Sequence, residues 1–201
     1  MKKQVIAAVA LAAATLMTGT AYAQAKEGPW MVRVRAVNLD SANTDSTGLG
    51  LSINNKVIPE LDISYFINKN VAVELVLTVP QKHTVTSTVV GRDIGTFEHL
   101  PPTLLVQYHF DAPGFKPYVG AGLNYTRIAK VDLLGGAADL DRNSFGAALQ
   151  VGVDIPLSSN LYLNFDIKKV YIGTNVSLGG VDKGSFKVDP LLVGVGLGWR
   201  F

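Results

Sequence analysis

Charged residues recur at alternate positions within otherwise apolar stretches of this sequence, and their types and spacing suggest ion pairing. Arg33 lies between Val32 and Val34, and Glu74 lies between Val73 and Leu75. Charges in such surroundings should pair with the opposite sign, because an unpaired charge away from water is very unfavourable. We expect six of them to form a polar plug inside the molecule: Arg33, Asp62, Glu74, Asp154, Asp166 and Arg200.

Groups suited to catalysis or metal binding are sparse. The chain has no cysteine, which excludes disulfides, thiolate zinc sites and cysteine nucleophiles. It also has no Gly-x-Ser-x-Gly elbow and no His-Glu-x-x-His motif. His83 and His99 fall in one predicted loop, where a solvated pair is a simpler explanation than a metal site, and His109 faces inward near a strand end. We predict no catalytic residue, no metal site and no cofactor.

The elements that must position the charged residues are β-strands. Eight segments alternate apolar and polar or small residues with a period of two, which is typical of strands, and no helical period is sustained after residue 23. The segments are 30–37, 60–65, 71–78, 103–110, 119–126, 144–155, 161–168 and 191–201.

The connections between these segments alternate in length. Three are short: 68–70, 111–116 and 156–160. Four are long: 39–56, 80–99, 130–143 and 173–185. Short turns at one end and long loops at the other are typical of an outer-membrane barrel. The sequence therefore predicts an all-β fold, an eight-stranded antiparallel up-and-down transmembrane β-barrel with short periplasmic turns and long extracellular loops.

The first 23 residues have the composition of an export signal. A basic start at Lys2 and Lys3 precedes an apolar run, and Ala21-Tyr22-Ala23 is a small-x-small cleavage site. We expect residues 1–23 to be a signal peptide and residues 24–201 to form the barrel. The chain without Lys2 and Lys3 has 16 basic and 16 acidic residues, which excludes a nucleic-acid binder recruited by bulk charge.

The alternation by itself fits both a soluble β-sandwich and a membrane barrel, and three details favour the membrane. Glycines fall on the polar face, where side chains would crowd a narrow lumen. On the apolar face, Arg127 and Lys169 are the only charges, near the ends of strands where they can reach headgroups. Aromatic residues on that face gather at the strand ends, as expected for interfacial girdles. The predicted girdle residues are Trp30, Tyr65, Trp199, Tyr125 and Tyr171.

Several segments resemble the OmpW family of eight-stranded bacterial outer-membrane proteins. They include Trp30-x-Val32-Arg33-x-Arg35-Ala36, Pro59-x-Leu61-x-Ile63-Ser64-Tyr65-Phe66, the block Pro117–Thr126 and the terminal Gly196-x-Gly198-Trp199-Arg200-Phe201. The resemblance covers residues 24–201. It implies a narrow channel that takes up small hydrophobic molecules in the outer membrane.

The inward residues become less charged toward the long-loop end, where Val76 and Leu105 are expected to form an apolar lining. A small apolar molecule could enter from outside and leave sideways into the bilayer, above the polar plug. Two alternatives stay open. One is a structural or adhesive barrel with a closed lumen and functional loops, and the other is a lipid-modifying enzyme.

The expected partners follow from this location. They are outer-membrane lipid and lipopolysaccharide, a small hydrophobic ligand, and the barrel-assembly machinery, for which Trp199 and Phe201 resemble the terminal signal. A closed barrel has no sheet edge that requires a partner, so the chain is expected to be a monomer.

Overall fold

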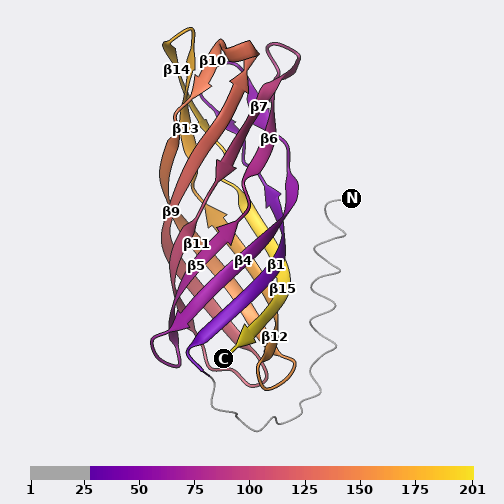
Figure 1. Ribbon diagram of the computed structural model, residues 1–201, viewed down its shortest axis with the longest axis vertical. Coiled ribbons are helices and arrows are strands. Elements are labelled where there is room, and N and C mark those ends of the chain that lie inside the picture. The colour runs from indigo at the N-terminus through magenta and orange to yellow at the C-terminus, as the bar shows by residue number, and fades with distance from the viewer. Residues whose placement is uncertain (1–27) are drawn as a thin grey trace.

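Eight strands close into an antiparallel barrel in the computed structural model, which describes residues 28–201 (Figure 1). Each strand pairs with the next along the barrel and the last returns to the first, so each of the eight strands has a paired neighbour on both sides. The strands are β1 (Trp30–Asp40), β4 (Lys56–Phe66), β5 (Val71–Thr78), β8 (Thr103–His109), β9 (Lys116–Leu133), β11 (Asn143–Pro156), β12 (Leu161–Val170) and β15 (Leu191–Arg200). All eight predicted strand segments and the barrel are confirmed. The predicted signal peptide, residues 1–23, lies outside the described residues.

The long connections are largely strands, although the sequence predicts loops there. They extend the wall beyond the barrel at one end (Figure 1). These elements are β2 (Thr44–Asp45), β3 (Leu51–Ile53), β6 (Gln81–Ser87), β7 (Arg92–Leu100), β10 (Ala138–Leu140), β13 (Gly173–Leu178), β14 (Val181–Lys187) and a short 3₁₀ turn, η1 (Leu134–Gly136). They were missed because their inward residues mix polar and apolar types, as the buried Gln81, His83, Val85 and Ser87 of β6 show. No helix among the described residues is long and apolar enough to cross a membrane.

The two ends of the barrel differ. Short turns join β4 to β5, β8 to β9 and β11 to β12, and the C-terminus lies at the same end (Figure 1). We call this the short-turn end and the opposite one the hairpin end. Phe201 pairs its backbone with Trp30 in both directions, at 3.0 and 2.9 Å, so the barrel is closed down to its last residue.

Apolar side chains cover the outside of the barrel. Along β1 the inward residues are buried, whereas Val34 between them is 51% exposed. The aromatic residues of the predicted girdles all point outward. Trp30, Tyr65 and Trp199 lie near the short-turn end, and Tyr125 and Tyr171 lie toward the hairpin end. An aliphatic band between two levels of aromatic rings matches the surface of a barrel in a bilayer.

The ladder between neighbouring strands is interrupted where β5 and β6 face β7 and β8. The pairing of β5 with β8 stops at Val76 and Thr103, and the pairing of β6 with β7 begins at Gln81 and His99. Within the described residues, no ladder pair joins 77–80 to 100–102. This stretch contains Pro80, Pro101 and Pro102, which have no backbone N–H to donate. We call it the wall interruption.

Candidate functional site

The barrel interior has two layers of opposite character. Along β1, the inward residues from the short-turn end are Met31, Arg33, Arg35, Val37 and Leu39, so charge gives way to hydrocarbon within one strand. The charged layer comprises Arg33, Arg35, Glu60, Asp62, Glu74, Asp154, Asp166 and Lys168. The apolar layer above it includes Val37, Leu39, Ile58, Val76, Leu105, Ile128, Ala148, Val170 and Leu192.

Arg33 links β1 to opposite parts of the wall. Its Nε and Nη2 donate to the Asp154 carboxylate at 3.1 and 2.7 Å, which is a bidentate pair with β11. Its Nη1 donates to Glu74 on β5 at 3.1 Å and to Ser64 on β4 at 2.8 Å. The guanidinium of Arg33 is fully buried. Its charge and hydrogen-bond donors are balanced by both carboxylate oxygens of Asp154 and by the carboxylate of Glu74.

Arg35 and Lys168 hold the upper part of the charged layer. Arg35 forms ion pairs with Glu60, at 3.0 Å, and with Asp62. Lys168 on β12 donates to Glu60 at 2.7 Å and to Asp166 at 2.6 Å. Glu60 thus joins two cations from different strands, and the ion pairs form one connected group across the lumen.

Neutral polar side chains complete the charged layer. The Tyr118 hydroxyl donates to Asp166 at 2.7 Å, and Gln150 donates to both Glu74 and Asp166 at 2.8 Å. In an eight-stranded barrel the interior is just wide enough for side chains to fill. In the described part of the chain, this layer holds three cations and five carboxylates, so it carries a formal excess of negative charge.

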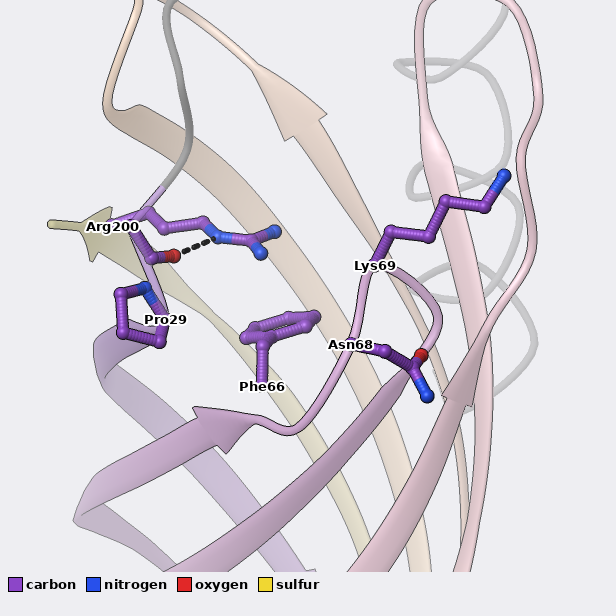
Figure 2. Close-up of a pocket in the computed structure, with 6 residues that line it drawn as sticks. Pro29, Phe66, Asn68, Lys69 and Arg200 are labelled. Atoms are coloured by element: carbon purple, nitrogen blue, oxygen red, sulfur yellow. Dashed lines mark hydrogen bonds between the residues drawn. The ribbon is translucent and has the colours of Figure 1, made fainter.

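Five of the six residues predicted for the polar plug come together here. The sixth, Arg200, lies one inward position below Arg33, at the short-turn end. Its Nε donates to the Gly28 carbonyl at 2.9 Å, and its guanidinium lies 3.7 Å from the centre of the Phe66 ring (Figure 2). Together with Pro29, Asn68 and Lys69 these residues line an open pocket of about 310 Å³.

Three charged residues of the layer were not among the predicted plug residues. Arg35 is two positions from Arg33, Glu60 is two positions from Asp62, and Lys168 is two positions from Asp166. Because alternate residues of a strand face the same side, the strand period placed all three inward. What sequence could not supply was the register between strands, which decides which charges meet across the lumen.

The apolar layer contains both residues predicted to form the apolar lining. Val76 is 5% exposed and Leu105 is fully buried, and both belong to the same hydrophobic cluster. Val76 is also the last β5 residue paired with β8 before the wall interruption. The apolar layer therefore reaches the wall interruption.

His83 and His99 are buried, so the expectation of a solvated loop pair was wrong. They lie on β6 and β7, in the hairpin extension beyond the eight barrel strands, with ring centroids 4.8 Å apart. Burial lowers the pKa of His83 to about 4 and the pKa of His99 to about 3, and the nearby charge of Lys56 acts in the same direction. Both imidazoles are therefore neutral near pH 7.

This arrangement resembles no catalytic or metal centre. No set of three or more histidine, aspartate or glutamate side chains within residues 28–201 is arranged to hold a metal ion. The carboxylates of the charged layer bond to cations, to Gln150 and to Tyr118 rather than facing an open cleft. The site is thus a lumen with a charged layer and an apolar layer, and the apolar layer borders the wall interruption.

Known proteins share this architecture over nearly the whole chain. The OmpW family model matches residues 25–201. The uncharacterized outer-membrane protein y4mB of Sinorhizobium fredii is 40% identical, covering 94% of this chain and 90% of that protein. Outer membrane protein W of Escherichia coli is 36% identical over the full length of both. DoxH of a Pseudomonas species, named as a dibenzothiophene metabolism operon protein, is 30% identical, covering 88% of this chain and 90% of that protein.

A solved structure supports the same fold. The outer membrane protein OprG of Pseudomonas aeruginosa superposes with a TM-score of 0.75 at 24% identity, covering 89% of this chain and 98% of OprG. Its similarity bears on the fold alone. The sequence relatives are outer-membrane proteins, and in such barrels the short turns face the periplasm, so the short-turn end is periplasmic and the hairpin end is extracellular. This chain belongs to the OmpW family of outer-membrane proteins.

Proposed function

We propose that this barrel is a transport protein that admits small hydrophobic molecules from outside the cell and releases them sideways into the outer membrane, without catalysing a reaction. The observation that carries the proposal is the position of the apolar layer. It lies on the extracellular side of the charged layer and borders the wall interruption.

The charged layer argues against a straight path into the periplasm. A hydrophobic molecule on that path would separate buried ion pairs such as Arg33 with Asp154, at a cost of several kcal/mol. Leaving through the wall interruption exposes it only to hydrocarbon. The name of the relative DoxH, which mentions dibenzothiophene, is consistent with an apolar aromatic cargo.

Substitution of Leu105 by arginine tests the route. Leu105 lies opposite Glu74 on β5, so an arginine there has a carboxylate partner and the barrel can still fold. We expect Leu105→Arg to lower naphthalene uptake by about tenfold in cells with intact lipopolysaccharide, because a charge then occupies the apolar layer. Leu105→Met, which keeps an apolar side chain, is the matched control and should retain uptake. Unchanged naphthalene uptake in the Leu105→Arg variant would contradict the proposed route.

A structural or adhesive barrel is the second candidate, favoured by the ordered hairpins at the extracellular end and by the filled lumen. The same pair of variants separates the two. An adhesive barrel would keep its surface binding in Leu105→Arg and show no protein-dependent naphthalene uptake in the wild type.

A further inference from the structure

The apolar interior contains one polar feature that the transport route leaves unexplained. His83 and His99 face inward from β6 and β7, at 0% and 1% exposure, among side chains of the hydrophobic cluster such as Val85 and Phe97. His99 is the residue with which ladder pairing resumes above the wall interruption. Any molecule passing from the extracellular end to the wall interruption therefore passes close to this pair.

The hydrogen bonds of the pair are incomplete in the described structure. His83 Nδ1 lies 3.1 Å from the Asn54 carbonyl oxygen, which can only accept, so Nδ1 carries the hydrogen and Nε2 is a bare acceptor. That Nε2 has no partner, and neither nitrogen of His99 has one. Since a neutral imidazole has one donor and one acceptor, the pair offers two acceptors and one donor. Unsatisfied buried groups of this kind are rare, and each calls for a physical explanation, of which ligand binding is one.

A hydroxyl group suits these unpartnered ring nitrogens better than a metal ion does. A metal ion would need further ligands, which residues 28–201 do not provide, and the cationic Lys56 lies near both rings. A hydroxyl is a single atom that donates one hydrogen bond and accepts others. It can donate to His83 Nε2 and accept from His99 at once.

We propose that His83 and His99 bind the hydroxyl group of hydrophobic alcohols and phenols entering the barrel, so that the protein favours these over the parent hydrocarbons. This inference rests on the proposed transport function and names a substrate class for it. The matched probes are 1-naphthol and naphthalene, which differ by one hydroxyl.

Nitrogen NMR of the full mature protein in lipid nanodiscs tests binding directly. The chain has three histidines, so ¹⁵N-histidine labelling reports on the pair, and His109 serves as an internal control at the opposite end of the lumen. We expect 1-naphthol, but not naphthalene, to shift the imidazole signals of His83 and His99 saturably while those of His109 stay fixed. If neither probe shifts them, or if both shift them alike, the pair does not recognise a hydroxyl group and the inference is overturned.

Uptake ratios test the consequence for transport. In His99→Phe, which removes both ring nitrogens, we expect the ratio of 1-naphthol to naphthalene uptake to fall about fivefold, as for the loss of one or two hydrogen bonds. His99→Gln keeps a donor and an acceptor and should restore most of the ratio. Heat-modifiable migration on gels confirms that both variants fold. An unchanged ratio in a folded His99→Phe variant overturns the inference alone, whereas absent naphthalene uptake in the wild type overturns the proposed function.

Discussion

The carboxylates of the charged layer differ in how completely their charges are balanced. Asp154 makes a bidentate pair with Arg33 and also accepts from Asn164 at 2.8 Å. Asp62 forms an ion pair with Arg35, but its two oxygens make no well-directed hydrogen bond in the described structure. Because the layer has more carboxylates than cations, the two residues should respond differently to neutralisation.

Asp154→Asn should lower the free energy of unfolding by about 3 kcal/mol, because it leaves the buried Arg33 without its main counter-charge. Asp62→Asn should lower the free energy of unfolding by clearly less. Arg35 still pairs with Glu60 in this variant, and the substitution removes one of the excess negative charges of the layer. Urea titration in lipid vesicles, followed by the fluorescence of Trp30 and Trp199, measures both. Equal losses for the two variants would contradict this account of the charged layer.

The histidine pair predicts a pH dependence of stability. The pKa values of His83, about 4, and His99, about 3, lie below the ordinary value of 6.5, so between these limits the unfolded chain binds protons that the folded protein does not. The two histidines therefore do not lower the free energy of unfolding above pH 6.5, where they are neutral in both states. They lower it progressively as the pH falls below 6.5. By pH 5.5 the loss should be about 1.4 kcal/mol for each histidine, and so about 3 kcal/mol for the pair. Urea titrations at pH 7.5 and 5.5 should show a smaller difference for the His83→Gln, His99→Gln double variant than for the wild type.

At the scale of single residues, sequence predicted which side chains face inward but not which ones meet. The strand period placed Arg33 and Asp154 on the lumen side, yet they are 121 positions apart and their pairing depends on barrel register. Arg200 shows the same limit. The strand period predicted correctly that it faces the lumen, but it could not show that Arg200 lies at the short-turn end, below the charged layer. His83 was misplaced because a mixed polar and apolar strand was read as a loop.

At the scale of elements, the eight barrel strands were predictable because a lipid-facing apolar row alternates with a lumen row along each of them. The hairpin strands have water outside, so their alternation is weaker and β6, β7, β13 and β14 were missed. The two-layered lumen also follows from the elements. The inward residues of β4 run from the apolar Ile58 through Glu60 and Asp62 to Phe66. Because β4 is antiparallel to β1, this order repeats in reverse the change from charged to apolar residues along β1.

Close packing between β11 and the interior predicts a sensitive glycine. A Cβ at Gly152 would lie 2.3 Å from the Tyr118 ring, which is itself fully buried and bonded to Asp166. Gly152→Ala should therefore lower the free energy of unfolding by about 1–3 kcal/mol, as overpacking does. Gly173→Ala is the matched control, since the nearest atom to its Cβ would be a Lys187 side-chain carbon at 3.6 Å. The urea midpoint measures both, and a loss as large in Gly173→Ala would refute the packing argument.

At the scale of the whole molecule, the low charge content reflects a barrel with an apolar exterior rather than a large soluble core. Only 17% of residues are charged, and many of them lie in the charged layer. The monomeric state of the protein stays a prediction. Contacts with lipopolysaccharide and the assembly role of Trp199 and Phe201 stay predictions.

The whole barrel should conduct ions poorly, because its charged layer spans the lumen, and Tyr118 is the residue whose removal should change this most. Tyr118 is fully buried, donates to Asp166 at 2.7 Å and accepts from Asn164 at 3.0 Å. Tyr118→Ala removes a ring from the middle of the lumen, leaving a cavity lined by polar groups that water can fill. In planar bilayers we expect this variant to show larger conductance steps than the wild type.

Tyr118→Phe is the matched control, because it removes the hydroxyl but keeps the ring that fills the lumen, and its conductance should match that of the wild type. Naphthalene uptake should be the same in all three proteins, since the proposed hydrophobic route leaves the barrel above the charged layer. Conductance that rises without a change in uptake would show two separate paths through one barrel. If uptake rose together with conductance, hydrophobic molecules would be crossing the charged layer, and release through the wall would be wrong.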